Sequence, residues 1–327
     1  MKIRVPDYFL DFKCIADRCT DSCCEGWEID IDKVTLEKYR HLDAPIGAEI
    51  REKTSHGCFP LQENGRCAFL DSRGLCRIIS AVGDRYLCDI CREHPRYYGV
   101  GRYGIEGGLG LGCEEAARMI LSLRSMPRFI EIERDIPYSD EDEFASMSDD
   151  LREALYNGIF DLSMPELIGK YIAQASTADE LAFKASVSGQ AVAITKVTYA
   201  PAQSDSIREI YQAFVSALSE CEALTHDWSE LTKRLGVFLT EEIMKKEKTL
   251  RPLLFYFTHR YVRDGIADMS LGARSLFALC SALTVTALSE IMGGEEPEVM
   301  AAVTYSKNIE YSTDNVDLIL DALSEFL

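Results

Sequence analysis

The stretch that decides the fold of the N-terminal part is residues 14–27, which read CIADRCTDSCCEGW. Four cysteines fall in its first eleven residues, and the last two, Cys23 and Cys24, are adjacent. Ten of the 12 cysteines in the chain lie between Cys14 and Cys113. Thiolates that are close in sequence can reach one centre because turns between them reverse the chain. Soft sulfur ligands select zinc or iron–sulfur clusters over hard cations, so we expect a cysteine-built metal centre in the first 113 residues.

The cysteine spacing favours an iron–sulfur cluster and leaves zinc as the alternative, with free or disulfide-bonded thiols third. Structural zinc sites usually contain two C-x2-C pairs, and only Cys88 and Cys91 have that spacing. The adjacent pair Cys23-Cys24 is unusual for a zinc ribbon, whereas iron–sulfur sites tolerate irregular spacings. Disulfides are rare in the cytosol, which favours metal binding by clustered cysteines there.

Residues 1–123 are predicted to form a small cysteine-rich module of short elements. Apolar runs are short and turn signals such as Asn64-Gly65 are frequent, so this module is expected to fold around a metal rather than a large apolar core. Its predicted elements are a strand over 28–32, a short helix over 35–41, a β-hairpin over 97–112 and a helix over 113–123.

The rest of the chain is predicted to be a linker followed by helices. Residues 124–146 contain Pro127, Pro137 and an acidic run, which favours a linker. From residue 147 to 327, apolar residues recur at helical spacing, and Ser148 is a candidate N-cap. The predicted helices cover 151–159, 179–195, 206–224, 227–246, 250–264, 271–292 and 314–327. The fold class is therefore α+β, mainly α: a small Cys-rich metal-binding module followed by an all-α helical domain.

Charge and hydropathy exclude several classes of function. The net charge is −19, of which residues 1–120 carry only −3, from 17 Lys/Arg and 20 Asp/Glu. A strongly acidic helical half repels phosphate backbones and argues against nucleic acid as a partner; it suits a basic, lysine-bearing protein, although simple solubility explains it as well. No continuous run of about 18 apolar residues predicts a membrane span. The first residues lack a secretory signal pattern, so a cytoplasmic location is expected.

Four motifs within residues 9–118 share a pattern with a known family. They are Cys14 to Asp32 with its Ala16-Asp17, Cys23-Cys24 and Gly26-Trp27 pairs; Cys67-Ala68-Phe69-Leu70-Asp71 followed by Gly74-Leu75-Cys76; Cys91-Arg92-Glu93-His94-Pro95-Arg96; and Leu109 to Arg118 around Cys113. Together they resemble the flagellin lysine N-methylases and, more loosely, a wider group of zinc- or iron-chelating proteins. One departure is the pair of residues that flank Cys113, glycine and glutamate here and serine and proline in the family.

The resemblance implies S-adenosylmethionine-dependent methyl transfer to lysine in a protein that carries a 4Fe–4S cluster, with flagellin or another lysine-bearing protein as the partner. It carries over eight candidate metal ligands: Cys14, Cys19, Cys23, Cys24, Cys67, Cys76, Cys91 and Cys113. Cys58 and Cys88 have no counterpart, and Cys221 and Cys280 are expected to be core thiols. One cubane needs four thiolates, so the surplus means a second metal, thiols beside the ligands or a disulfide; the sequence leaves these open.

Catalytic and S-adenosylmethionine-binding residues stay unassigned. The glycine run 99–112 lacks the strand–GxGxxG–helix context, so the cofactor is expected in a cleft between the module and the helical domain. Side chains near the cysteine motifs, each weighed against a purely structural role, are Trp27, Asp32, His94, Arg96, Tyr97 and Tyr98. The aromatic segment 255–261 is expected to pack the helical domain, with Arg260 or Arg263 paired to Asp264 or Asp268. The alternatives to an enzyme are a non-catalytic zinc- or iron–sulfur-binding module and an electron-transfer protein.

Overall fold

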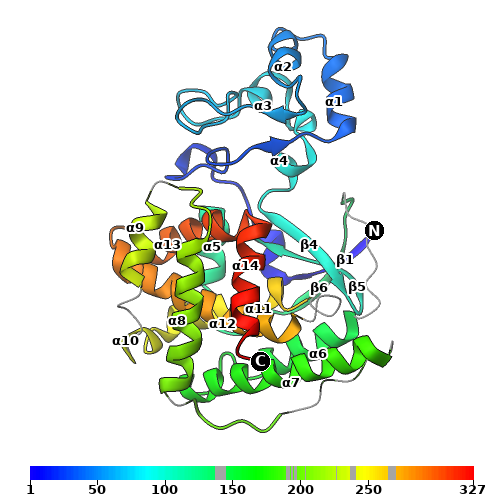
Figure 1. The fold of residues 1–327 in the computed structure, drawn as a ribbon. Coiled ribbons are helices and arrows are strands. Elements are labelled where there is room, and N and C mark those ends of the chain that lie inside the picture. Colours follow the sequence, from blue (N-terminus) through cyan, green and yellow to red (C-terminus); the bar gives the residue numbers. More distant parts are fainter. Residues whose placement is uncertain are drawn as a thin grey trace.

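The computed structural model divides into a small lobe and a large body (Figure 1). The structure describes residues 1–136, 145–188, 192, 194, 197–202, 204–225, 227–235, 241–263 and 270–327. We call residues 28–95 the small lobe, residues 13–27 the cysteine loop, and the remaining described residues the large body. Each of the two bodies has an apolar core of its own.

A four-stranded sheet forms one side of the large body, in the order β4-β5-β1-β6. Its strands are β1 (Lys2–Pro6), β4 (Arg96–Gly101), β5 (Gly104–Leu109) and β6 (Phe129–Glu133). β4 and β5 form the antiparallel hairpin that the glycine-rich segment 97–112 predicts. β1 pairs with β5 in parallel and with β6 in antiparallel register. The N-terminal strand therefore connects the hairpin to β6.

Helices make up the rest of the large body. They are α5 (Glu114–Leu121), α6 (Ala145–Tyr156), α7 (Met164–Ser188), α8 (Ser204–Glu220), α9 (Trp228–Leu235), α10 (Glu241–Met244), α11 (Glu247–Tyr261), α12 (Leu271–Met292), α13 (Pro297–Tyr305) and α14 (Thr313–Ser324). A π-helical segment, Ser306–Glu310, continues from α13. The helices pack around α12, which contacts α7, α11 and α13 along its length. Sheet and helices share a single apolar core.

The central helix α12 is the most apolar part of the helical half that the structure describes. Among the described residues, it is the helix that is long and apolar enough to cross a membrane by length and composition. Its Ser and Thr residues and Arg274 interrupt the apolar sequence, so it contains no continuous apolar run long enough to predict a span. In the structure, 89% of its most apolar window is buried inside the protein. Its apolar surface is thus covered by the neighbouring helices.

The small lobe is built from short elements around a second apolar core. The elements are β2 (Ile29–Asp30), α1 (Lys33–Arg40), α2 (Gly47–Lys53), β3 (Cys58–Phe59), α3 (Arg77–Val82) and α4 (Asp89–Glu93). β2 and β3 pair in antiparallel register. The core includes the rings of Tyr39, Phe59 and Phe69, all almost fully buried. The lobe therefore has more apolar packing than its short apolar runs predicted.

The predicted elements are found with shifted boundaries. The strand, the hairpin and the helices at 35–41 and 113–123 are confirmed, and so are helices in each predicted segment of the C-terminal half. Three predictions need correction. Residues 129–133, placed in a linker, form β6 against β1 because Ile130 and Ile132 alternate with acidic residues. Ser148 lies inside α6, which begins at Ala145, and is buried rather than capping. The helix α13 was not predicted.

The domain boundaries at residues 123 and 147 stay a prediction. The two apolar cores divide the chain at different positions from the predicted boundaries. β1 and α5 belong to the core of the large body, whereas the core of the small lobe comes from residues 29–91. Residues 137–144 of the predicted linker lie outside the described residues.

Candidate metal centre

Seven of the eight predicted ligand cysteines line one cavity of about 790 Å³. They are Cys14, Cys19, Cys23, Cys24, Cys76, Cys91 and Cys113. The eighth, Cys67, does not line the cavity; it is buried in the small-lobe core. All twelve cysteines are free thiols in this structure. The cavity lies between the cysteine loop, the small lobe and the N-terminus of α5, so tertiary structure brings Cys113 to thiols about 90 residues earlier.

The cysteine loop is held against the large body by one buried carboxylate. Glu114, in the first turn of α5, accepts hydrogen bonds from the Thr20 amide at 2.7 Å and the Thr20 hydroxyl at 2.9 Å. Arg118, one turn later, donates to Glu114 at 3.0 Å and to Glu296 at 2.7 Å. Cys113 is the N-cap residue of α5. The same helix end therefore presents a thiol to the cavity and fixes the loop that carries four others.

The π-helical segment supplies a second attachment. Lys307 is buried, and its ammonium donates to the Asp21 carboxylate at 2.6 Å and to the Ser22 carbonyl at 2.9 Å. π-Helical turns are rare and are frequent at functional sites. Next to it, the carboxylate of Glu310 accepts a hydrogen bond from the Tyr256 hydroxyl at 2.8 Å and lies 3.6 Å from Arg260 Nε. One segment thus connects the cysteine loop to the charged interior of the large body.

The thiols differ in acidity. A hydrogen bond with Cys24, whose sulfur lies 3.9 Å away, and the charge of Lys307 outweigh burial and lower the pKa of Cys23 to about 7. Burial, followed by the neighbouring Cys113 and Glu114, raises the pKa of Cys19 to about 12. Burial also raises the pKa of Cys113, to about 11. Crowded thiols resist ionisation without a cation, so deprotonation of the whole set requires a positive centre among them.

Buried donors around the cavity fit an anionic group. His94 Nε2 and Arg96 Nε are buried, and each lacks a hydrogen-bond partner in the part of the chain that the structure describes; Arg66 Nε is buried beside the Glu25 carboxylate, 3.8 Å away. All three residues line the cavity. Buried polar atoms without partners point to an absent ligand or water, and a metal cluster with four thiolates carries negative charge. Burial, with Lys307 and Arg260 nearby, lowers the pKa of His94 to about 4, so its ring is neutral near pH 7.

Across the described residues, no three His, Cys, Asp or Glu side chains are close enough to hold one metal ion. The donors that line the cavity are mainly thiols, the ligand type that zinc and iron–sulfur clusters share.

The remaining residues singled out in the sequence have structural contacts. His94 and Arg96 line the cavity, and Arg96 also lies over the rings of Phe9 and Phe12. Asp32 accepts hydrogen bonds from the amides of Thr35 and Asp89, as a helix cap. Tyr98 donates to Glu93 at 2.8 Å. These hydrogen bonds give Asp32 and Tyr98 a structural role, and no catalytic role is needed to account for their positions.

The aromatic segment of α11 packs the large body as predicted, and its arginines lie among buried charges and rings. Arg260 stacks over Tyr97 at 4.7 Å and lies beside Glu310, whereas Asp264 and Asp268 lie outside the described residues. Arg263 donates to the His259 carbonyl at 2.7 Å. Cys221 and Cys280 are buried in the large core, as predicted for core thiols.

Sequence reasoning missed the residues that the C-terminal helices bring to the loop. Tyr311 packs against Trp27, and a Cβ at Gly112 would lie 2.4 Å from the Tyr311 hydroxyl. Glycine at 112 therefore allows the ring to approach the chain next to Cys113. Neither Lys307 nor Tyr311 belongs to a motif. The isolated Lys307 between apolar helices was the one available signal, because buried lysine needs a partner.

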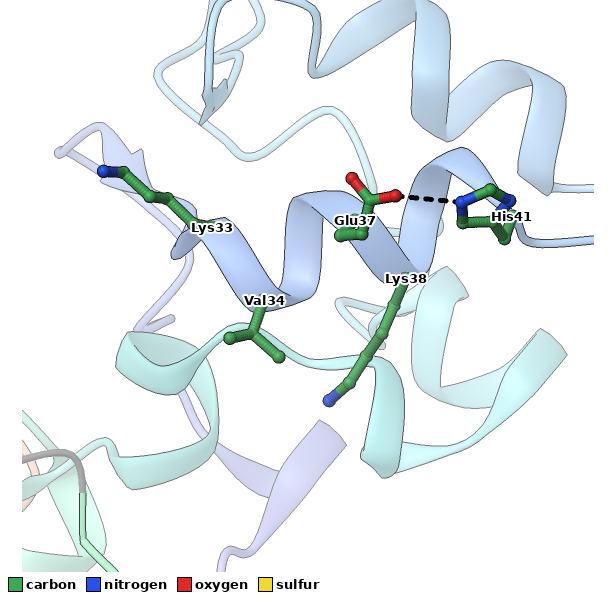
Figure 2. Close-up of a pocket in the computed structure, with 5 residues that line it drawn as sticks. All are labelled: Lys33, Val34, Glu37, Lys38 and His41. Atoms are coloured by element: carbon green, nitrogen blue, oxygen red, sulfur yellow. Dashed lines mark hydrogen bonds and ion pairs between the residues drawn. The ribbon is translucent and has the colours of Figure 1, made fainter.

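A second hollow lies along α1, away from the cysteines. Figure 2 shows its lining residues, which are Lys33, Val34, Glu37 and Lys38 of α1 and His41 at the C-terminal cap of the same helix. Glu37 and His41 are 2.9 Å apart, and both are exposed. An open surface along a single helix with solvated charges has no converging chemistry, so the cysteine cavity is the candidate site.

Comparison with known proteins finds relatives of this chain in the family that the cysteine motifs indicate. Flagellar biosynthetic protein FliU from Salmonella muenchen is 30% identical over 130 residues, which cover 36% of this chain and 75% of FliU. This chain belongs to the flagellin lysine N-methylase family. Two lysine-N-methylases, from Salmonella choleraesuis strain SC-B67 and Salmonella typhimurium strain LT2, are each 29% identical over 130 residues. No family model and no solved structure matches the chain.

The family relationship covers a part of each methylase. The match spans 32% of the length of the two lysine-N-methylases and 36% of this chain. Membership therefore supports a methyltransferase role in general terms, and the reaction, cofactors and substrate of this chain are matters for a proposal.

Proposed function

We propose that this protein is an S-adenosylmethionine-dependent protein-lysine N-methyltransferase that carries a thiolate-bound iron–sulfur cluster in the cysteine cavity. The observation that carries the proposal is the gathering of seven family-type cysteines around one cavity in a chain related to lysine-N-methylases. Flagellin, or another lysine-bearing protein, is the proposed substrate. The strongly acidic helical half, net −16 after residue 120, would attract such a basic partner.

The cavity has room for more than a cluster. Its volume of about 790 Å³ is within the range of about 300–1,000 Å³ that is typical of small-molecule sites. Asp17, Asp21, Glu25 and Glu114 line it together with Arg66 and Arg96. Carboxylates favour a sulfonium, and the arginines favour a carboxylate. We therefore infer that S-adenosylmethionine binds beside the thiols.

The reaction requires a neutral lysine amine. A lysine with a pKa of about 10.4 is mostly protonated at pH 7, and its deprotonation costs about 4–5 kcal/mol. The acidic side chains at the cavity can accept the proton, while the ring of Phe12 in the cavity wall excludes water. A bound iron–sulfur cluster would supply one-electron chemistry or a Lewis-acidic iron. The chain's own task is to orient donor and acceptor.

The direct test is methyl transfer by the reconstituted full-length chain. Protein purified anaerobically and loaded with iron and sulfide is mixed with flagellin and S-adenosylmethionine labelled in the methyl group, and methyl-lysine is measured by mass spectrometry. We expect label in flagellin with the wild type and with Cys58→Ser, and none with Cys113→Ser. Cys58 lies on β3 and does not line the cavity, so it is a matched cysteine control.

Calorimetric titration separates the enzyme from its alternatives. Binding of S-adenosylmethionine to the loaded protein supports the methyltransferase. A chain that carries metal but shows no binding at millimolar cofactor and no transfer would instead be a non-catalytic metal module or an electron-transfer protein. Binding together with transfer to another lysine-rich protein, but not to flagellin, would retain the reaction and reject flagellin.

A further inference from the structure

We propose that the eight predicted ligand cysteines form two separate four-thiolate metal centres. The interlobe set is Cys14, Cys19, Cys23 and Cys113, and the lobe set is Cys24, Cys67, Cys76 and Cys91. Each set takes a soft, thiophilic centre, either an iron–sulfur cluster or zinc. The inference extends the metal site of the proposed function and does not depend on methyl transfer.

Apolar packing separates the two sets. Cys67 is a buried member of the small-lobe core, and Cys24, Cys76 and Cys91 pack against that core. Cys113 packs against the core of the large body instead. Cys14 and Cys23 are exposed on the cysteine loop. The lobe set therefore belongs to one compact unit, whereas the interlobe set joins the loop to the large body.

Backbone hydrogen bonds support the same division. The Cys67 amide donates to the Cys24 carbonyl at 2.8 Å, and the Leu70 amide donates to the Cys67 carbonyl at 3.0 Å. Leu70 forms an antiparallel bridge with Cys76. Cys24, Cys67 and Cys76 are thus connected through one short run of backbone. In the interlobe set, the bonds from Thr20 to Glu114 connect the loop to the helix that Cys113 caps.

The two sets meet at the adjacent residues Cys23 and Cys24, whose sulfur atoms lie 3.9 Å apart. Cys24 packs against the small-lobe core, whereas Cys23 is exposed on the cysteine loop.

A division into two centres accounts for the number of thiols. One cubane or one structural zinc ion takes four thiolates, so eight are twice what a single centre binds. In two-cluster ferredoxins, cysteines that are close in sequence also serve different clusters. Cys88 is buried in the small-lobe core beside Cys67, but it is not one of the eight predicted ligands, so it is assigned as a supporting thiol.

The test is the metal content of single-cysteine variants of the full chain. Wild type, Cys19→Ser, Cys113→Ser, Cys76→Ser and the control Cys58→Ser are loaded anaerobically with ferrous iron and sulfide, or with zinc alone. Iron, sulfide and zinc are quantified, and native mass spectrometry counts the centres on each molecule. We expect two centres in the wild type and Cys58→Ser, and one in each of the other variants. The combination of Cys113→Ser with Cys76→Ser should leave none.

The two loading arms identify the metal, and two iron–sulfur clusters or one cluster plus one zinc ion both support the inference. One centre in the wild type overturns it. It is also overturned if Cys19→Ser and Cys113→Ser lose all metal, since these substitutions lie outside the small-lobe core; circular dichroism and the melting profile check that both variants remain folded. Metal counting is independent of activity. Two centres without methyl transfer would reject the proposed function alone, and an active protein with one centre would reject this inference alone.

Discussion

The rings of Trp27 and Tyr311 pack against each other with centroids 5.0 Å apart and planes inclined at 50°. Trp27 ends the cysteine loop, and Tyr311 lies between the π-helical segment and α14. The indole nitrogen also donates to the Cys23 carbonyl at 3.0 Å. This pair, together with Lys307 and Asp21, attaches the cysteine loop to the C-terminal helices.

Replacement of Trp27 by alanine should loosen the cysteine loop. An aromatic pair contributes about 0.5–1.5 kcal/mol beyond its buried area, so amides in residues 13–27 should exchange several-fold faster. Hydrogen-exchange mass spectrometry of the full chain measures this. Trp27→Phe keeps the stacking and removes the N–H donor, and should show an intermediate effect. Unchanged exchange in Trp27→Ala would show that the pair does not hold the loop.

Replacement of Tyr311 by phenylalanine should leave stability unchanged. The Tyr311 hydroxyl is buried and has no hydrogen-bond partner among the described residues, so its removal breaks no bond and should change the free energy of unfolding by no more than about 0.5 kcal/mol. Urea unfolding gives the value. Reduced metal retention or methyl transfer in this stable variant would assign the hydroxyl to a bound ligand. A loss of more than about 1 kcal/mol would contradict the prediction.

Replacement of Glu310 by glutamine should be strongly destabilising. Its fully buried carboxylate lies beside Arg260 and accepts a hydrogen bond from the Tyr256 hydroxyl. Removal of one partner leaves a buried charge uncompensated, at a cost of about 3–5 kcal/mol. Urea unfolding of the large body tests this. Glu180→Gln is the control, because the Glu180–Lys184 pair is solvent-exposed and contributes less than about 1 kcal/mol.

The large body should lose stability as the pH falls from about 6.5. Burial, with Arg263 and Arg152 nearby, lowers the pKa of His259 to about 3, below an unfolded value of about 6.5. Between these values the unfolded chain binds a proton that the folded chain excludes. Stability therefore decreases on acidification by up to about 1.4 kcal/mol per pH unit.

The histidine responsible can be identified by substitution. His259→Gln should flatten the dependence of unfolding free energy on pH between about 6.5 and 4.5. His41→Gln, at an exposed position on α1, should leave the slope as in the wild type. Equal slopes for His259→Gln and wild type would assign the acid sensitivity elsewhere.

Removal of metal should unfold the small lobe and spare the large body. Metal binding supplies folding free energy to small domains rich in ligands, and the lobe has a limited core. The chain has two tryptophans, Trp27 beside the lobe and Trp228 buried in the large body. Trp27→Phe therefore reports on the large body alone. An identical melting profile for loaded and metal-free wild type would refute the prediction.

The sequence by itself determined most of the elements and showed where the cysteines cluster. Alternation predicted the hairpin β4–β5, helical periodicity predicted most helices, and clustered cysteines indicated a thiolate centre. These features depend on interactions between residues close in the chain, which local patterns record. The strand β6 was not predicted, because the prolines and the acidic run near it are also typical of a linker.

Only the tertiary structure decided which residues surround the thiols. The ammonium of Lys307 and the ring of Tyr311 come from a segment more than 280 residues after the loop that they contact. It also distributed the adjacent Cys23 and Cys24 between different surroundings, with only Cys24 packed on the small-lobe core. Contacts between distant segments depend on how complete elements pack, and a single sequence carries no local pattern for them.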